Sequence, residues 1–294
     1  MSSLGLYLIS VLIWGSTWFA ITFQFGRVPP AVSVAYRFAL AGSTLVAWAA
    51  VKRLRLRFPA SDHLWLALQG LLLFGINYVC VYLAETQITS GLVAVAFSLL
   101  VVLNIVFSRV FFRTPLRPGI LAGAALGIVG VALVFLPEIR GGAAAGNATT
   151  GIALALVGAV SASFGNIVAY RNYARGLPLI QQNAFGMLYG AVAVAAFALV
   201  EHQPFPFDGS AHYLLSLAYL TLFGSIVAFG AYLALLGRIG ADRAGYVTVA
   251  IPVVAVLLSG LFEGLEWRPS LAIGVLFCVA GNVAVLRGKT RAES

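Results

Sequence analysis

Long apolar stretches separated by short polar gaps run along almost the whole chain. Ten of these stretches are long enough for an α-helix to cross the hydrocarbon core of a bilayer, which takes roughly 20 residues. They are predicted at residues 4–24, 31–51, 63–84, 91–112, 118–137, 151–171, 179–200, 212–236, 243–262 and 269–287. The pattern therefore predicts an all-α integral membrane protein with ten transmembrane helices and no separate soluble domain.

Lys and Arg are concentrated in alternate gaps between these stretches. Of the 18 basic residues, 14 fall on one side of the predicted membrane, 3 fall on the other and Arg37 lies inside the second stretch. The 14 are Lys52, Arg53, Arg55, Arg57, Arg109, Arg113, Arg117, Arg171, Arg175, Arg238, Arg243, Arg287, Lys289 and Arg291, and the 3 are Arg27, Arg140 and Arg268. By the positive-inside rule the richer side is cytoplasmic, and an even number of spans then places both termini in the cytoplasm.

Composition agrees with a membrane protein. The chain has 294 residues, of which 61% are hydrophobic and 9% are charged, and its mean hydropathy is +0.99, far above the range of soluble domains. The net charge of +9 is divided among predicted cytoplasmic gaps, so it indicates topology rather than nucleic-acid binding. The first stretch is too long for a signal-peptide core and has no small-residue cleavage pattern, so we expect it to be retained.

An internal repeat relates the two halves of the chain. Matching positions are Phe74-Gly75 with Phe223-Gly224, at an offset of 149, and Gly123 and Gly130 with Gly274 and Gly281, at an offset of 151. Each half holds five predicted spans, which is an odd number, so the second half must enter the membrane from the opposite face. Inverted pairs of this kind are typical of secondary transporters, whose binding site lies near the midplane where the repeats meet.

The predicted domain boundaries follow from this repeat. Residues 1–140 form the first five-helix unit and residues 151–287 the second, inverted unit. A Gly- and Ala-rich extracytoplasmic linker is predicted at residues 141–150, because such a composition is flexible. Residues 288–294 are predicted to form a cytoplasmic tail.

Several motifs resemble those of a known family. They are Trp14-Gly15-Ser16 in the first span, Arg37-Phe38 in the second, and Pro252 followed by Glu266 before a Gly-rich last span. As a set they resemble the drug/metabolite transporter superfamily, specifically its EamA-type ten-helix members. The first half departs from the pattern, since Val101 and Pro115 stand where the second half has Pro252 and Glu266, which puts functional symmetry between the halves in doubt.

The resemblance implies a secondary transporter in the plasma (inner) membrane of a bacterium. Among EamA-type members the chain is most similar to amino-acid exporters, including exporters of aromatic amino acids. The expected partners are a small-molecule substrate and the lipid bilayer, with no cofactor, no metal and no nucleic acid. Small residues at four-residue intervals, such as Gly119, Gly123 and Gly127, allow close helix packing, which we attribute to packing within one chain that functions as a monomer.

Polar and aromatic residues in the middle of spans are the candidate substrate-binding residues. Each is costly in hydrocarbon unless it faces protein or a water-filled cavity, although aromatic stripes in membrane helices are also common as simple packing. The candidates are Asn77, Tyr78, Tyr82, Ser98, Phe164, Asn166, Phe229, Tyr232, Tyr246 and Arg37. A cavity of rings and neutral polar groups suits an amphiphilic organic solute better than a bare metal ion.

Arg37 is the one ionisable residue predicted well inside a span. One interpretation makes it the partner of a substrate carboxylate. The alternative is that it bonds helix-end carbonyls or snorkels outward to the interface. The sequence leaves both open.

No acidic residue is predicted in the middle of a span, and most acids are predicted at the outer edges, while Asp62, Asp242 and Glu293 fall on the cytoplasmic side. The acids at the outer edges include Glu85, Glu138, Glu201, Glu263 and Glu266. Carriers driven by protons or sodium commonly use an intramembrane carboxylate, so this distribution predicts flux down the substrate gradient, or coupling so weak that pH steps barely change it.

Other classes of protein fit less well. A membrane enzyme would need a nucleophile activated by a base, and no His, Asp, Glu or Lys is predicted in mid-span. Gly288-Lys289-Thr290 imitates the end of a phosphate loop, but Val283 stands where its first glycine is required. A channel-like pore and an exporter of drugs or hydrophobic cations remain alternatives.

Overall fold

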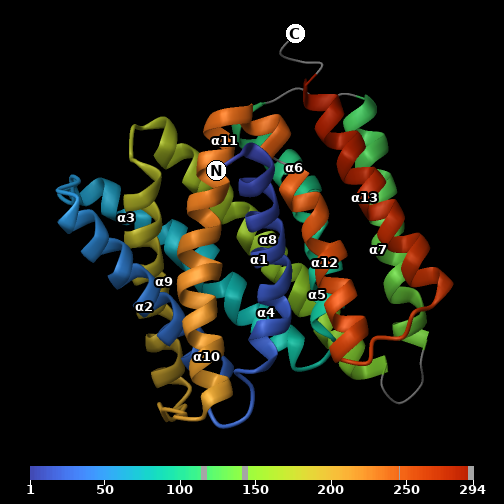
Figure 1. Cartoon of the computed structure of the whole chain (residues 1–294), viewed down its shortest axis with the longest axis horizontal. Helices are drawn as coiled ribbons and strands as arrows, with labels where there is room; N and C mark the ends of the chain where they lie inside the picture. The colour runs from blue at the N-terminus through green and yellow to red at the C-terminus, as the bar shows by residue number, and fades with distance from the viewer. Residues whose placement is uncertain (114–117, 141–144, 245, 291–294) are drawn as a thin grey trace.

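The computed structural model describes residues 1–113, 118–140, 145–244 and 246–290, and all the regular structure in these ranges is helical (Figure 1). The helices of the first half are α1 (Ser3–Thr22), α2 (Pro30–Val51), α3 (Ala60–Gly70), η1 (Leu71–Ile76), α4 (Asn77–Glu85), α5 (Ser90–Phe97), α6 (Leu100–Phe112) and α7 (Pro118–Arg140). Those of the second half are α8 (Ala145–Ala174), α9 (Leu179–Val200), α10 (Ala211–Tyr219), η3 (Leu220–Val227), α11 (Ala228–Ala244), α12 (Tyr246–Phe262) and α13 (Pro269–Thr290).

The predicted spans correspond to helical segments of sufficient length. Within the described residues, nine segments are long and apolar enough to cross a membrane, and Tyr246–Phe262 is a tenth, shorter apolar helix. Some boundaries differ from the prediction. Helix α8 begins at Ala145, inside the range predicted as linker, and residues 141–144 of that linker and 291–294 of the tail lie outside the described residues.

Three spans are interrupted in ways that were not predicted. The fourth span is divided at Ser98 and Leu99, whose amides bond Val95 and Ala96 three residues back and so tighten the turn. The third and eighth spans each contain a π-helical segment, η1 and η3, which begin at Leu71 and Leu220. These two start positions are separated by 149 residues, which is the offset of the sequence repeat, and each segment contains one of the matching Phe-Gly pairs.

Large apolar side chains point outward from the bundle, while polar side chains lie inside it. Leu64, Leu215 and Leu261 expose 70–73% of their surface. Inside, Asn172 donates to Gln69 over 2.9 Å, and both residues are buried. A soluble protein shows the reverse arrangement, so the apolar exterior is the surface that lipid covers.

Glycines set the closest helix contacts. A Cβ added to Gly130 of α7 would lie 2.6 Å from the carbonyl oxygen of Gly274 in α13, and one added to Gly123 would lie 2.6 Å from the carbonyl oxygen of Gly281. Under the sequence repeat, Gly123 corresponds to Gly274 and Gly130 to Gly281, so each contact is the repeat image of the other. These contacts lie within one chain, as expected from the small-residue spacing.

The ends of the bundle are distinct. Connections at 23–29, 86–89, 201–210 and 263–268, all in gaps predicted to be extracytoplasmic, lie at its lower end in Figure 1. The first turn of α1 and the last turn of α13 lie toward the other end. We refer to the lower end, which is predicted to face away from the cytoplasm, as the outer end.

Candidate substrate site

Arg37 lies at the centre of a polar and aromatic cluster in the interior. The side chain extends from α2 and is 1% exposed. Its Nε donates to the Ser225 hydroxyl in η3 over 3.4 Å. Its guanidinium carbon lies 4.8 Å from the centre of the Tyr78 ring and 5.2 Å from that of Phe38, which is within the range of cation–π attraction.

The guanidinium retains unused hydrogen-bonding capacity. Its Nη1 is buried and has no hydrogen-bond partner, and in the part of the chain that the structure describes no carboxylate forms an ion pair with it. Because Arg37 is buried, the interpretation in which it snorkels outward is wrong. A buried guanidinium with free donors beside aromatic rings is suited to bind a planar anion such as a carboxylate.

The π-helical segment η3 brings the second half against this cluster. Gly224 has no side chain, so α1 can approach closely: an added Cβ would lie 2.8 Å from Cγ2 of Thr17 and 3.4 Å from Nη2 of Arg37. Trp14 also contacts this segment, because its indole Nε1 donates to the Gly224 carbonyl over 3.1 Å. Glycine at this position is therefore needed for the contact between α1, α2 and η3.

Replacing Gly224 with alanine is expected to destabilise the protein by about 1–3 kcal/mol, because the added methyl group overpacks the contact with Thr17. The repeat-related Gly75 provides a matched control, since its added Cβ would meet nothing closer than 3.5 Å. Thermal unfolding of the purified protein in detergent measures both variants. Equal melting temperatures for Gly224→Ala and Gly75→Ala would contradict the proposed close contact.

A cavity of about 320 Å³ adjoins the cluster on the side away from the outer end. Its walls come from α2, α9, η3 and α11, and its lining residues are Thr44, Leu45, Trp48, Ile180, Asn183, Ser225, Ile226, Phe229 and Gly230. Ser225 connects the cavity to Arg37, because it lines the first and bonds the second. We call this space the apolar cavity.

Three of the predicted site residues lie near Trp14 and the inner part of α1. The Trp14 ring packs edge-on against Phe229, with ring centres 5.0 Å apart, and in a tilted arrangement against Tyr232, with ring centres 5.4 Å apart. Tyr246 is half-buried, and its backbone carbonyl accepts from the hydroxyl of Tyr7 over 3.4 Å. Trp14 thus joins Phe229 and Tyr232 to the Arg37 cluster through its bond to Gly224.

The predicted residues of the third span are arranged along α4. Tyr78 faces Phe38 and Arg37. Tyr82 is fully buried, and its hydroxyl donates to Gln24 over 2.8 Å. Asn77 is also buried and donates to the carbonyl of Leu73 over 3.0 Å. In this conformation Tyr78 and Tyr82 both lie beside Arg37, and Tyr82 also bonds Gln24 in the connection after α1.

The remaining predicted residues belong to a different group. Phe164 of α8 stacks on Phe107 of α6 at 4.2 Å, and Asn166 donates to Asn104 over 3.4 Å. Ser98 is buried beside Cys278. These three residues therefore do not belong to the Arg37 cluster. Phe164 and Asn166 join α8 to α6, and Ser98 joins the α5–α6 junction to α13, whereas the Arg37 cluster is formed by α2, α4 and η3.

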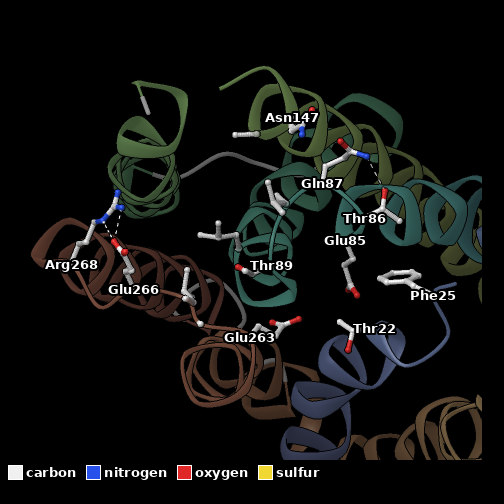
Figure 2. Close-up of a pocket in the computed structure, with 15 residues that line it drawn as sticks. Thr22, Phe25, Glu85, Thr86, Gln87, Thr89, Asn147, Glu263, Glu266 and Arg268 are labelled. Atoms are coloured by element: carbon white, nitrogen blue, oxygen red, sulfur yellow. Dashed lines mark hydrogen bonds and ion pairs between the residues drawn. The ribbon is translucent and has the colours of Figure 1, made fainter. Parts of the chain in front are cut away.

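A second pocket, of about 620 Å³, opens at the outer end, and we call it the outer pocket. Figure 2 shows that its lining comes from the ends of α1, α4 and α8 and from the connection after α12. Glu85 and Glu263 both line it, and Glu266 at its edge forms an ion pair with Arg268 at 2.6 Å. The pocket was not predicted from the sequence, because its walls come from several connections that are far apart along the chain.

Glu85 lies at the outer end of its span, as expected, but it is buried, so the expectation that the interior holds no buried carboxylate is wrong. The residue ends α4, yet it is only 8% exposed, and within the described residues neither carboxylate oxygen has a hydrogen-bond partner. After Glu85 the chain turns back into α5, which packs closely on α12: a Cβ on Gly91 would lie 2.7 Å from Cβ of Ser259. Hydropathy along the chain does not report such a fold-back.

The apolar exterior, the polar interior and the buried, unpaired Arg37 together define a multi-pass membrane protein with an internal polar site. Comparison with known proteins identifies its family. The model of the EamA-like transporter family matches residues 1–136 and again residues 149–287. The chain therefore belongs to the EamA-like transporter family, and it is a membrane transporter.

Individual relatives agree with this assignment. The "Uncharacterized inner membrane transporter YedA" of Escherichia coli K12 is 32% identical over 286 residues, which cover 95% of this chain and 88% of that protein. "Protein PagO" of Salmonella typhimurium is 24% identical over 262 residues, which cover 88% of this chain and 84% of that protein. One crystal structure matches the fold with a TM-score of 0.70 at 23% identity, covering 100% of this chain and 99% of that one.

Proposed function

We propose that the protein is a secondary transporter of the bacterial inner membrane that exports amino acids, with aromatic amino acids favoured. The observation that carries this proposal is Arg37, a buried guanidinium that lies beside the rings of Tyr78 and Phe38 and whose Nη1 has no hydrogen-bond partner among the described residues. A carboxylate bound there would receive charge-assisted hydrogen bonds, and an aromatic side chain would have rings to stack on. The inner-membrane location is supported by the relative YedA, which is named as an inner membrane transporter.

The size of the apolar cavity favours a small solute. Its volume of about 320 Å³ is near the lower end of the range of ligand pockets, roughly 300–1,000 Å³. Phe229 provides an aromatic wall, and Ser225 and Asn183 provide the polar groups. A carboxylate near Arg37 and a ring in this cavity would together satisfy both ends of an aromatic amino acid.

The mechanism that we propose is alternating access by two inverted repeats. It is supported by the two separate matches to the family model, by the π-helical segments 149 residues apart and by the reciprocal glycine contacts of α7 and α13. Along α2, Arg37 lies between the outer end and the apolar cavity. Rocking of the two halves would therefore open the Arg37 cluster alternately to the outer pocket and to the cytoplasmic side, where both termini are placed by the basic-residue pattern.

Counterflow in proteoliposomes tests this proposal. Vesicles preloaded with unlabelled L-phenylalanine are expected to accumulate labelled L-phenylalanine transiently and saturably, and a panel of other amino acids and hydrophobic cations defines the solute class. Uptake that is fast, unsaturable and free of any overshoot would instead indicate a pore. Counterflow of hydrophobic cations alone would replace the amino-acid assignment with drug export.

A further inference from the structure

Glu85 is a buried acid for which the transport proposal gives no role. Its two carboxylate oxygens are buried and have no hydrogen-bond partner in the part of the chain that the structure describes, although the residue lines the outer pocket. Figure 2 shows the side chain directed into the space between the end of α1, where Thr22 and Phe25 lie, and Glu263. A buried polar group without a partner carries a free-energy cost that calls for an explanation.

The neighbours of Glu85 determine which ligand could bind its carboxylate and remove the free-energy penalty of burying it without a partner. Glu263 lies opposite and is already satisfied, since its Oε2 accepts from the Ser90 amide over 3.2 Å and from the Ser90 hydroxyl over 2.6 Å. The other charged or titratable groups that act on Glu85 are Arg37 and Tyr82, both deeper in the bundle. Arg268 at the pocket edge is paired with Glu266.

The formal charges of this group do not balance without an additional cation. Arg37 contributes one positive charge, and ionised Glu85 and Glu263 would contribute two negative ones. Glu263 has two hydrogen bonds that stabilise its ionised form, whereas Glu85 has none. One proton on Glu85 would make the group neutral and remove an unpaired charge from a poorly solvated site.

We propose that Glu85, facing Glu263 across the outer pocket, is a proton-binding site that is loaded from the outer side. The proton comes from water in the pocket, binds one carboxylate oxygen of Glu85 and returns to the same water when Glu85 ionises. This site does not depend on which solute the transporter carries. It also removes the basis for expecting uncoupled flux, because that expectation required the interior to be free of acids.

Proton occupancy should affect closure of the outer end. The bonds from Ser90 to Glu263 join α5 to the end of α12, and Gly91 packs tightly against Ser259 beside them. A protonated Glu85 leaves this closure undisturbed, whereas an ionised Glu85 places a second negative charge beside Glu263. Loss of the proton is therefore expected to favour opening at the outer end, a consequence that rests on the proposed alternating access.

Infrared titration of the purified transporter tests the proton site directly. At about pH 7 an ordinary glutamate, with a pKa of about 4.3, is ionised, so we expect wild-type protein to show the C=O band of a protonated carboxyl group and to lose it as the pH rises. Glu85→Gln should remove this band, while Glu201→Gln, a change at an exposed acid at the end of α9, should retain it. Glu263→Gln should shift its loss to lower pH, since the neighbouring negative charge is gone.

Two results would overturn the proposal. The first is a wild-type spectrum without such a band at neutral pH. This measurement uses the wild-type protein alone, so it does not depend on whether a variant folds. The second is a band that persists in Glu85→Gln. The consequence for transport is measured separately. Raising the outer pH should speed L-phenylalanine counterflow by about fivefold or more in wild type, and it should not change the counterflow rate of Glu85→Gln. Absence of any phenylalanine counterflow would contradict the proposed function, while the infrared result would still decide the proton site.

Discussion

Replacing Arg37 with glutamine is expected to weaken binding and counterflow of L-phenylalanine by about 10-fold to 100-fold. A hydrogen bond to a charged group contributes about 1.5–3 kcal/mol, and glutamine retains a polar side chain but loses the positive charge. Arg37→Lys should recover only part of the activity, because an ammonium group cannot bind a carboxylate through two parallel bonds. The half-saturation concentration in the counterflow assay measures the effect.

Two controls separate binding from folding. Arg27→Gln removes a positive charge from an exposed position at the outer end and should leave counterflow unchanged. The melting temperature of Arg37→Gln in detergent shows whether the fold survives. If this variant is folded and transports L-phenylalanine with wild-type affinity, Arg37 is not the carboxylate partner.

Replacing Gly130 with alanine is expected to cause the largest loss of stability. The new methyl group would lie 2.6 Å from the Gly274 carbonyl oxygen and 2.7 Å from the backbone nitrogen of Cys278, and backbone atoms cannot rotate away. Helices α7 and α13 would have to separate, at a cost of about 3 kcal/mol or more. This corresponds to a fall in melting temperature of about 5–10 °C.

Gly119 on the same helix provides the matched control. An added Cβ there would meet no atom within 4 Å, so Gly119→Ala should leave the melting temperature of the detergent-purified protein nearly unchanged. If both alanine variants unfold at the wild-type temperature, the close crossing of α7 and α13 does not contribute to stability as proposed. Dimer dissociation in Gly130→Ala, with an intact fold, would indicate that the glycine face packs between two chains instead.

The apolar pattern was sufficient to predict the helical membrane fold. A stretch of about 20 apolar residues can cross lipid only as an α-helix, because the helix satisfies every backbone hydrogen bond within the segment. The helical segments Ala60–Glu85 and Leu179–Val200 match their predicted spans within a few residues. The π-helical segments could not be predicted, because η1 and η3 reflect contacts with helices distant in the sequence. Gly224 and Thr17, for example, are in contact although they are 207 residues apart in the sequence. The periodicity of apolar residues within one helix carries no information about such a contact.

The candidate site was predicted in part. Arg37 and Tyr78 proved to be neighbours, and both had been selected because polar or amphipathic groups in mid-span need partners. Phe164 has the same character in the sequence but stacks on Phe107 in another group, since residue type does not specify which helix face meets which. The burial of Glu85 could not be predicted, because its position at the end of a span suggested an exposed side chain, whereas tertiary packing leaves the residue 8% exposed.

Competition in the counterflow assay tests the central claim most directly. Phenethylamine has the ring and amine of phenylalanine but lacks the carboxylate that Arg37 is proposed to bind. We predict that unlabelled L-phenylalanine and L-tyrosine will compete with labelled L-phenylalanine in wild type, while phenethylamine will compete about 10-fold or more weakly. Equal competition by phenethylamine would contradict a carboxylate site at Arg37.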